Sequence, residues 1–212
     1  DLMEKDGRKY VRVVDYKSGS KLFKLDDVYY GLNLQMLIYL FSIWKNGKGQ
    51  LKDCLPAGVL YLPAKDHIIT ASRETTDEQI EKEHRKKYKM NGLILEDPVC
   101  VAGMEREVSG VFIPVKTKSD GSFDARSSLA SLEQMGCIQK HIEFVLSEMA
   151  QHLQQGKIEA VPSNGLGYEP CKYCDYKSNC QHQQQDPEKK LKEIGKEEFF
   201  AQLREEQQNA DQ

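Results

Sequence analysis

The sequence has 212 residues, of which 39% are hydrophobic and 30% charged, and this composition indicates one globular domain, or one domain with an appendage. No apolar run comes near the roughly 20 residues that cross a bilayer, and no basic and then apolar leader opens the chain, so we expect a cytoplasmic protein without a membrane partner. The formal net charge of −3 argues against a generally basic DNA-binding protein. It does not exclude an enzyme whose positive charge is confined to a cleft and supplied partly by metal ions.

The N-terminal third of the chain predicts two strands around a helix. The chain opens on a strand end and an Asp6-Gly7 turn, and residues 9–17 follow as a strand rich in β-branched and aromatic residues. Because a natural domain seldom begins inside a hairpin, we expect this to be a fragment of a longer chain. Residues 28–44 are apolar nearly all round and predict one buried helix, and residues 57–62 predict a second, buried strand.

The middle of the chain continues this α/β alternation. Residues 74–90 are charged and open with Thr-Thr-Asp capping residues, which predicts a helix, and a short segment follows at 98–105. Residues 111–115 predict a third strand, which Pro114 places at a sheet edge. Residues 124–156 predict a long helix with an apolar stripe.

The C-terminal part of the chain has a different composition. Residues 161–182 combine Pro, Gly and Asn with clustered cysteines, and residues 186–206 predict a charged helix. We therefore divide the chain into a core over 1–160, a cysteine-rich segment over 161–185 and a charged helical tail over 186–212.

A carboxylate and an ammonium group lie two residues apart at the end of the first full strand. Because side chains alternate along a strand, Asp15 and Lys17 share one face. The pair is either a surface ion pair, worth about 0–1 kcal/mol, or a metal-binding carboxylate beside a lysine that orients or deprotonates a water molecule.

Two polar side chains interrupt the apolar helix that follows. Gln35 and Tyr39 lie four residues apart and therefore on one helix face. Burying an unpaired amide costs about 1–3 kcal/mol, so we expect Gln35 to have a polar partner. That partner belongs either to a core hydrogen bond or to the edge of an active site that holds DNA or the lysine.

Three cysteines cluster in a turn-rich segment after Pro170. Cys171, Cys174 and Cys180 have a spacing that suits a soft metal centre. A Cys3His zinc site with His182 is one interpretation. A [4Fe–4S] cluster is the other, but it needs four thiolates and this segment has three.

The remaining cysteines and histidines suggest no further site. Cys54, Cys100 and Cys137 have no partner at ligand spacing and are interpreted as core or surface thiols. The histidines form no closely spaced pair, so we assign no catalytic histidine, and we expect His141 and His152 on a helix surface.

Residues 13–18 (VVDYKS) and 30–40 (YGLNLQMLIYL) resemble the D-Y-K and Q-x-x-x-Y motifs of the RecB-type nucleases in the PD-(D/E)xK superfamily. Their spacing, and residues 87–95, most resemble the AddB-type chains of bacterial AddAB helicase–nucleases. The resemblance extends to about residue 182. It implies a restriction-endonuclease-like mixed sheet flanked by helices, followed by a cysteine-rich iron–sulfur knot.

The resemblance also implies roles for the polar residues. Asp15 would bind Mg²⁺ or Mn²⁺, with the Tyr16 carbonyl as a possible further ligand. Lys17 would position or activate the attacking water, and Gln35 and Tyr39 would contact the DNA strand or support Lys17.

One departure from the family pattern concerns a second metal-binding aspartate on the preceding strand. Asp1 aligns with the later Asp of the family's Gly-x-Ile-Asp-Arg-Ile-Asp pattern, which is not the ligand. We therefore expect the ligand to lie before this chain and the fragment alone to be inactive or nearly so. The alternative is that Asp1 itself binds the metal.

For the cysteines, the resemblance implies a [4Fe–4S] cluster whose fourth cysteine lies far upstream, outside this chain. Such a cluster would link distant parts of the chain and act structurally.

The family implies a metal-dependent DNA exonuclease that processes DNA ends in double-strand break repair by homologous recombination, with a helicase of the AddA type as partner. Two alternatives stay open. One is a stand-alone Cas4-like iron–sulfur exonuclease, and the other is a non-catalytic module that binds a DNA end or a partner and carries a zinc knot.

Overall fold

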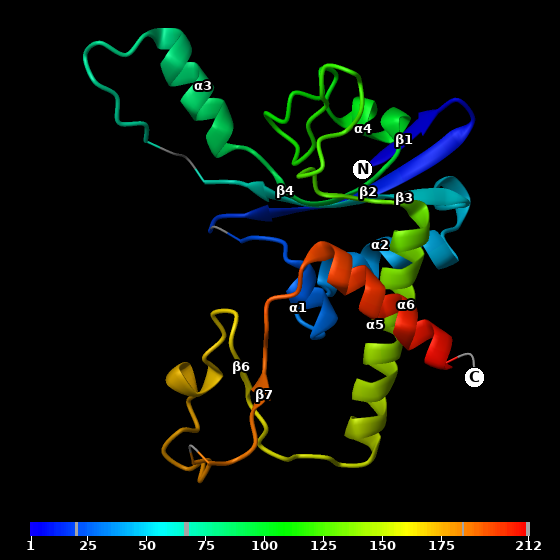
Figure 1. Cartoon of the computed structure of the whole chain (residues 1–212), viewed down its shortest axis with the longest axis vertical. Helices are drawn as coiled ribbons and strands as arrows, with labels where there is room; N and C mark the ends of the chain where they lie inside the picture. Colours follow the sequence, from blue (N-terminus) through cyan, green and yellow to red (C-terminus); the bar gives the residue numbers. More distant parts are fainter. Residues whose placement is uncertain (20, 66–67, 184, 211–212) are drawn as a thin grey trace. The chain divides into compact units, whose positions relative to one another are not determined.

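A computed structural model describes residues 1–19, 21–65, 68–183 and 185–210 (Figure 1). The chain forms two compact units. The first is Asp1–Lys24 with Asn33–Gln139, and the second is Leu25–Leu32 with Lys140–Gln212. The domain boundaries expected after residues 160 and 185 rest on composition and stay predictions.

The first unit is built on a five-stranded mixed sheet with the order β1-β2-β3-β4-β5. Neighbouring strands are alternately antiparallel and parallel, beginning with an antiparallel β1–β2 hairpin. The strands are β1 (Leu2–Lys5), β2 (Arg8–Lys17), β3 (Cys54–Pro63), β4 (Asn91–Leu95) and β5 (Leu129–Ala130). The expected mixed α/β sheet is confirmed, and the strands predicted at 9–17 and 57–62 are β2 and β3.

Helices lie on both faces of this sheet (Figure 1). On one face, α2 (Gln35–Asn46) packs on β2 and β3 and buries Met36, Leu37, Leu40 and Phe41. On the other face, α4 (Pro98–Met104) covers a cluster of Leu60, Ile94, Val101, Ile113, Val115 and Leu129. Val14 packs against this second cluster, so the alternating residues Asp15 and Lys17 face the α2 side.

Helix α3 (Asp77–Lys87) has no buried residue and extends away from the sheet (Figure 1). Thr76 caps its start, accepting a hydrogen bond from the Gln79 backbone N–H while the Gln79 side chain accepts one from Thr76. This reciprocal pair is a capping box, and it confirms a capped helix where the sequence predicted one from its Thr-Thr-Asp residues.

Close backbone approach explains why a glycine stands in β4. A Cβ at Gly92 would lie 1.9 Å from the backbone oxygen of Val59, so any side chain would force β3 and β4 apart.

The second unit contains α1 (Leu25–Tyr29), most of α5 (Leu132–Gln154), α6 (Lys196–Ala210) and a parallel pair of short strands. These strands are β6 (Ser163–Asn164) and β7 (Lys189–Lys190). Phe199, Phe200 and Leu203 form the buried apolar face of α6. The helix predicted over 186–206 begins only at Lys196.

The single helix predicted over residues 28–44 is wrong, because the structure divides it into α1 and α2. Gly31 and Asn33 both take positive φ angles, 79° and 54°, which end one helix before the next begins. A Cβ at Gly31 would lie 3.0 Å from the side chains of Val145 and Met149, so the turn also needs a residue without one.

The strand predicted at 111–115 is also wrong. These residues form no regular strand, although Ile113 and Val115 are buried. Their backbone is held by Glu105, whose carboxylate accepts hydrogen bonds from the N–H groups of Val111, Phe112 and Ile113. The strand that follows β3 in the chain is β4, at Asn91–Leu95, which the sequence did not predict. The long helix predicted from residue 124 begins at Leu132.

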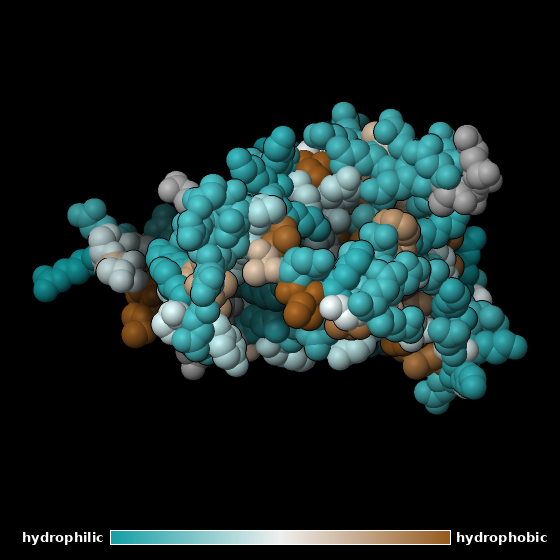
Figure 2. All heavy atoms as spheres, turned by 90° about the horizontal axis from the view of Figure 1, so that it is seen from below, coloured by the Kyte–Doolittle hydropathy of each residue, from teal (hydrophilic) through white to brown (hydrophobic). Residues whose placement is uncertain are grey.

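No helix in the described ranges has both the length and the hydropathy needed to cross a membrane. The face drawn in Figure 2 is mostly hydrophilic, with small separate hydrophobic areas.

Candidate functional site

Asp15 and Lys17 lie at the C-terminal end of β2, paired in parallel with Tyr61 and Pro63 of β3. The Lys17 Nζ is 2.7 Å from the Asp15 Oδ2, and the two side chains are 32% and 30% exposed. Tyr16, between them, points to the opposite face and is 68% exposed. The structure therefore brings the predicted carboxylate and lysine together as a solvent-accessible ion pair.

A buried aromatic ring supports a second lysine beside this pair. Tyr61 is 4% exposed, and its ring centroid lies 5.8 Å from the Lys17 Nζ and 5.4 Å from the Lys21 Nζ. The Lys21 ammonium also donates to the Asn33 Oδ1 at 2.6 Å. Two ammonium groups thus share one ring at the end of the sheet.

Asn91 fixes the loop that carries Lys21. Its Nδ2 donates to the Lys21 carbonyl at 2.8 Å, and its Oδ1 accepts from the Phe23 backbone N–H at 2.7 Å. Because Asn91 pairs with Tyr61 across β3 and β4, the loop is tied directly to the sheet beneath the site.

The ion pair borders a hollow lined by five lysines: Lys17, Lys21, Lys65, Lys87 and Lys89. No Asp or Glu is among the described residues that line it. Sequence reasoning missed this hollow, because its lysines are scattered between residues 17 and 89 and only the fold brings them together.

Gln35 and Tyr39 are joined to each other. The Gln35 Nε2 donates to the Tyr39 hydroxyl at 3.2 Å, so the expected polar partner is present. Both residues are exposed, however, and the premise that the amide is buried is wrong. Among the described residues, no hydrogen bond or ion pair links these two to Asp15 or Lys17.

The carboxylates near the site do not form a ready metal cage. In the described part of the chain, no group of three or more His, Cys, Asp or Glu residues is placed to hold a metal ion. Asp1 is opposite Arg12, and its Oδ2 accepts from the Arg12 Nε at 2.8 Å. The Asp1 carboxylate is therefore engaged in an ion pair with Arg12, which precedes Asp15 by three residues on β2.

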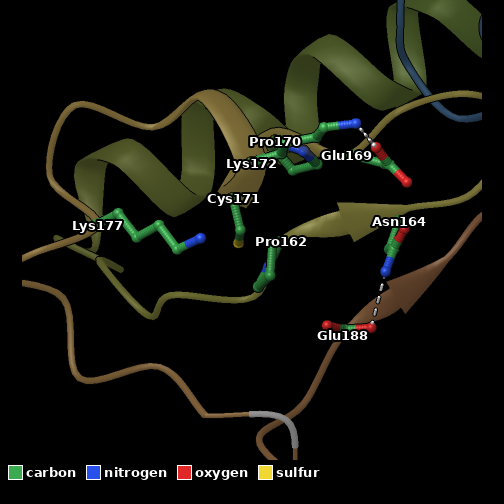
Figure 3. Close-up of a pocket in the computed structure, with 8 residues that line it drawn as sticks. All are labelled: Pro162, Asn164, Glu169, Pro170, Cys171, Lys172, Lys177 and Glu188. Atoms are coloured by element: carbon green, nitrogen blue, oxygen red, sulfur yellow. Dashed lines mark hydrogen bonds and ion pairs between the residues drawn. The ribbon is translucent and has the colours of Figure 1, made fainter.

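The three clustered cysteines lie in the second unit and are all exposed. Cys171 is in a short 3-10 helix, Pro170–Tyr173, and lines a pocket with Lys172 and Lys177, among others (Figure 3). The sulfurs are not gathered into a ligand set in the described residues. The Nε2 of His182 is 3.5 Å from the Pro187 carbonyl oxygen.

The other three cysteines are buried, as core thiols are. Cys100 is fully buried, and burial raises the pKa of its thiol to about 12. Its Sγ lies 3.9 Å from the Ala57 carbonyl oxygen, so this thiol is a protonated part of the core.

The expectation that His141 lies on a helix surface is wrong. His141 is 5% exposed and stacks on the Tyr29 ring within the second unit. Its Nδ1 is 2.9 Å from the Glu206 Oε2, and its Nε2 is 3.0 Å from the Tyr29 carbonyl oxygen. His152 is exposed as expected, and His67 lies outside the described residues.

The chain is similar to known nucleases along most of its length. Residues 1–181 match the PD-(D/E)XK nuclease superfamily. The chain also resembles proteins that are named as one of the subunits of an ATP-dependent helicase/deoxyribonuclease. It is 43% identical over 183 residues to the one from Clostridium acetobutylicum, 40% over 191 to that of Clostridium botulinum and 36% over 182 to that of a Thermoanaerobacter species. Each match covers 85% of this chain but 16% of the relative's length.

Proposed function

The chain belongs to the PD-(D/E)XK nuclease superfamily, and we propose that it is the nuclease domain of a helicase–nuclease complex and hydrolyses DNA with a divalent metal ion. The observation that carries the proposal is the Asp15–Lys17 pair, solvent-accessible at the end of β2 and bordering a hollow lined by lysines. A carboxylate, an ammonium group and a positive hollow are what metal-assisted attack on a phosphodiester requires.

The donor set fits Mg²⁺ or Mn²⁺ in part. Asp15 offers one carboxylate, of which the Oδ2 contacts Lys17, and we propose the Tyr16 carbonyl as a further oxygen ligand. Mg²⁺ commonly binds one or two carboxylates and keeps several waters, so this set suits it better than a metal that demands an all-protein cage. When bound, the ion would activate a water molecule and neutralise charge on the phosphate.

The register of the β1–β2 hairpin supports a proposal for the position of a second carboxylate. Leu2 pairs with Val11 and Asp1 bonds to Arg12, so in a longer chain the residue three positions before Asp1 would stand opposite Asp15. That position is a non-hydrogen-bonded pair, whose Cα atoms approach to about 4.5 Å and whose side chains share a face. We propose that the second metal ligand stands there and that Asp1 is not a ligand.

Lys17 supplies the positive charge next to the reacting phosphate. An ammonium group has three donors, of which one contacts Asp15, and the others remain for a phosphate oxygen or the attacking water. The Tyr61 ring beneath it holds the ammonium at the end of the strand. We propose that Gln35 and Tyr39, exposed on α2 at the same face of the sheet, contact the DNA strand.

We further propose that Cys171, Cys174 and Cys180 supply three of the four thiolates of a [4Fe–4S] cluster. All three are exposed, and apart from the 3-10 turn at Cys171 the segment around them is loop and turn, which leaves their sulfurs able to move together around a cluster. The fourth thiolate would come from another part of the longer protein. The cluster would hold distant segments together and take no part in phosphodiester hydrolysis.

The biological setting is proposed from the name that the relatives share. An ATP-dependent helicase/deoxyribonuclease made of subunits implies DNA and a helicase partner, which we propose to be of the AddA type. The complex would process DNA ends in the cytoplasm during double-strand break repair by homologous recombination. Because the chain spans 16% of these relatives, that setting concerns the whole protein.

The test is degradation of linear DNA by the full-length protein with its helicase partner, in Mg²⁺ and in EDTA. We expect cleavage only with Mg²⁺, and Lys17→Ala should reduce it by at least about 100-fold, as loss of one charge-stabilising group does. Lys5→Ala, at the opposite end of the hairpin, is the matched control and should cleave normally. Cleavage by Lys17→Ala at the control's rate would refute the proposed role of this site.

A further inference from the structure

The lysine hollow extends well past the residues that the proposed chemistry uses. Lys17 is at one side, while Lys65, Lys87 and Lys89 follow from β3 and from the end of α3. Lys89 also lines two neighbouring hollows, one of which contains Lys116 and Arg126. These neighbouring hollows also contain Asp124, Glu78 and Glu81, so the stretch of lining with no described acidic residue runs from Lys17 to Lys89.

Two basic side chains of the adjacent helix α3 form ion pairs with glutamates, unlike the lysines that line the hollow at its end. On α3, Arg85 pairs with Glu81 and Lys86 pairs with Glu83. Neither Lys87 nor Lys89 forms an ion pair with another residue that the structure describes. In a chain of net charge −3, a hollow with five lysines and no described acidic lining concentrates positive charge.

The hollow offers nothing, among its described lining residues, that would recognise a base. The single aromatic ring in that lining is Tyr61, which is 4% exposed beneath Lys17 and Lys21 and so cannot stack on a nucleotide. The amide of Asn91 is already engaged with the backbone of the loop that carries Lys21. Ammonium groups on flexible stems bind phosphates as point charges and carry no sequence information.

We propose that Lys65, Lys87 and Lys89 form a subsite for the backbone phosphates that follow the cleaved one, and that it binds a single DNA strand regardless of base sequence. The inference rests on the proposed nuclease function and extends it to the substrate. Lys21, held by Asn33 and the Tyr61 ring, links the subsite to the cleavage position.

The test is equilibrium binding of a fluorescent single-stranded oligonucleotide to the full-length protein in EDTA, where no cleavage occurs. The variant is Lys65→Gln/Lys87→Gln/Lys89→Gln, whose side chains are all exposed, so we expect the substitutions to leave folding intact. The matched control is Lys5→Gln/Lys48→Gln/Lys52→Gln, which removes equal charge at the far end of the sheet. Thermal unfolding of both variants should match wild type.

We expect the subsite variant to bind at least about tenfold more weakly at low salt. Its slope of log K against log salt should be shallower by about 2, because each lost phosphate contact on a single strand removes about 0.7. The control should keep the wild-type slope. The weakening should be equal for a thymidine oligonucleotide and a mixed sequence of the same length.

Equal losses in the two triple variants would show a general charge effect and overturn the subsite, as would an unchanged slope or a loss confined to one sequence. These outcomes are independent of the nuclease test. If the subsite variant loses binding while wild type fails to cleave DNA in Mg²⁺, the subsite stands and the proposed nuclease function falls.

Discussion

The two candidate sites of this chain are built in opposite ways. Asp15 and Lys17 stand on a strand whose register with β3 fixes their face and spacing, and a buried tyrosine lies beneath the lysine. Cys171 stands on a single turn of 3-10 helix and Cys174 and Cys180 on irregular chain, and all three are exposed and not gathered in the described residues. A strand end can hold polar groups in place without their ligand, whereas a loop-built site needs its cluster to order it. Removing one residue should therefore affect chemistry at the first site and order at the second.

The largest expected effect is on DNA cleavage by Asp15→Asn. The substitution keeps the shape of the side chain but removes its charge, and cleavage should fall by at least about 100-fold. Stability should change by no more than about 1 kcal/mol, because the ion pair is about a third exposed and screened by solvent. The measurements are cleavage rate and chemical denaturation.

Combining Asp15→Asn with Lys17→Ala sharpens this prediction. Residues that act as a unit have non-additive effects, so the double variant should cleave no more slowly than the worse single variant. Multiplicative losses would mean that the two residues act separately.

Next in size is loss of the cluster in Cys171→Ser. Anaerobically purified full-length wild type should be brown, with broad visible absorbance, and should contain iron and sulfide. The variant should lose the visible absorbance and the bound iron and sulfide. Ser178→Ala, in the same segment, is the matched control and should stay brown. Colourless wild type carrying zinc would replace the cluster with a zinc site.

A smaller effect is expected from His141→Ala in the second unit. The variant removes the buried contacts of the ring with the Glu206 carboxylate and the Tyr29 carbonyl oxygen, which should cost about 1–3 kcal/mol of the free energy of unfolding. His152→Ala, on the exposed face of the same helix, should stay within about 0.5 kcal/mol of wild type. Equal effects would mean that the buried contacts of His141 do not stabilise the unit.

At neutral pH the smallest predicted effect is that of the Cys100 thiol, which destabilises the fold only in alkaline solution. Burial raises the pKa of its thiol from 9.0 to about 12, so between these values the unfolded chain releases a proton that the folded chain keeps. Stability therefore falls as pH rises through this window, by at most about 1.4 kcal/mol per pH unit. The stability difference between wild type and Cys100→Ala should shrink from pH 9 upward, and a constant difference would contradict the shift.

The sequence predicted the elements whose signals are local. β2 follows from a β-branched and aromatic run, β3 from an apolar run, and the capped helix α3 from its Thr-Thr-Asp residues. The break at Gly31 and Asn33 was missed because the apolar pattern continues across it. Strand β4 was missed because a short run with four buried residues next to a loop gives little periodicity. Residues 111–115 contain the apolar Ile113 and Val115, but Glu105 holds the backbone N–H of Ile113 in an irregular segment.

In the candidate site, too, contacts between residues close in sequence were predictable and contacts between distant residues were not. The shared face of Asp15 and Lys17 follows from strand geometry alone, and the Gln35–Tyr39 contact follows from helical spacing. The burial of His141 depends on Tyr29 and Glu206, which are distant in sequence, and no local pattern reports it. The lysine hollow likewise required the fold that brings Lys89 beside Lys17.

The central claim, a divalent metal ion at Asp15, is tested most directly by replacing Mg²⁺ with Fe²⁺ in the full-length protein and generating hydroxyl radicals there with ascorbate and peroxide. Radicals formed at a bound ion cut the nearby backbone, and mass spectrometry locates the cuts. We predict cuts near the ends of β2 and β3, around Asp15 and Tyr61, that disappear in Asp15→Asn and in excess Mg²⁺. Cuts that persist in Asp15→Asn, or no cuts at these strand ends, would contradict the account.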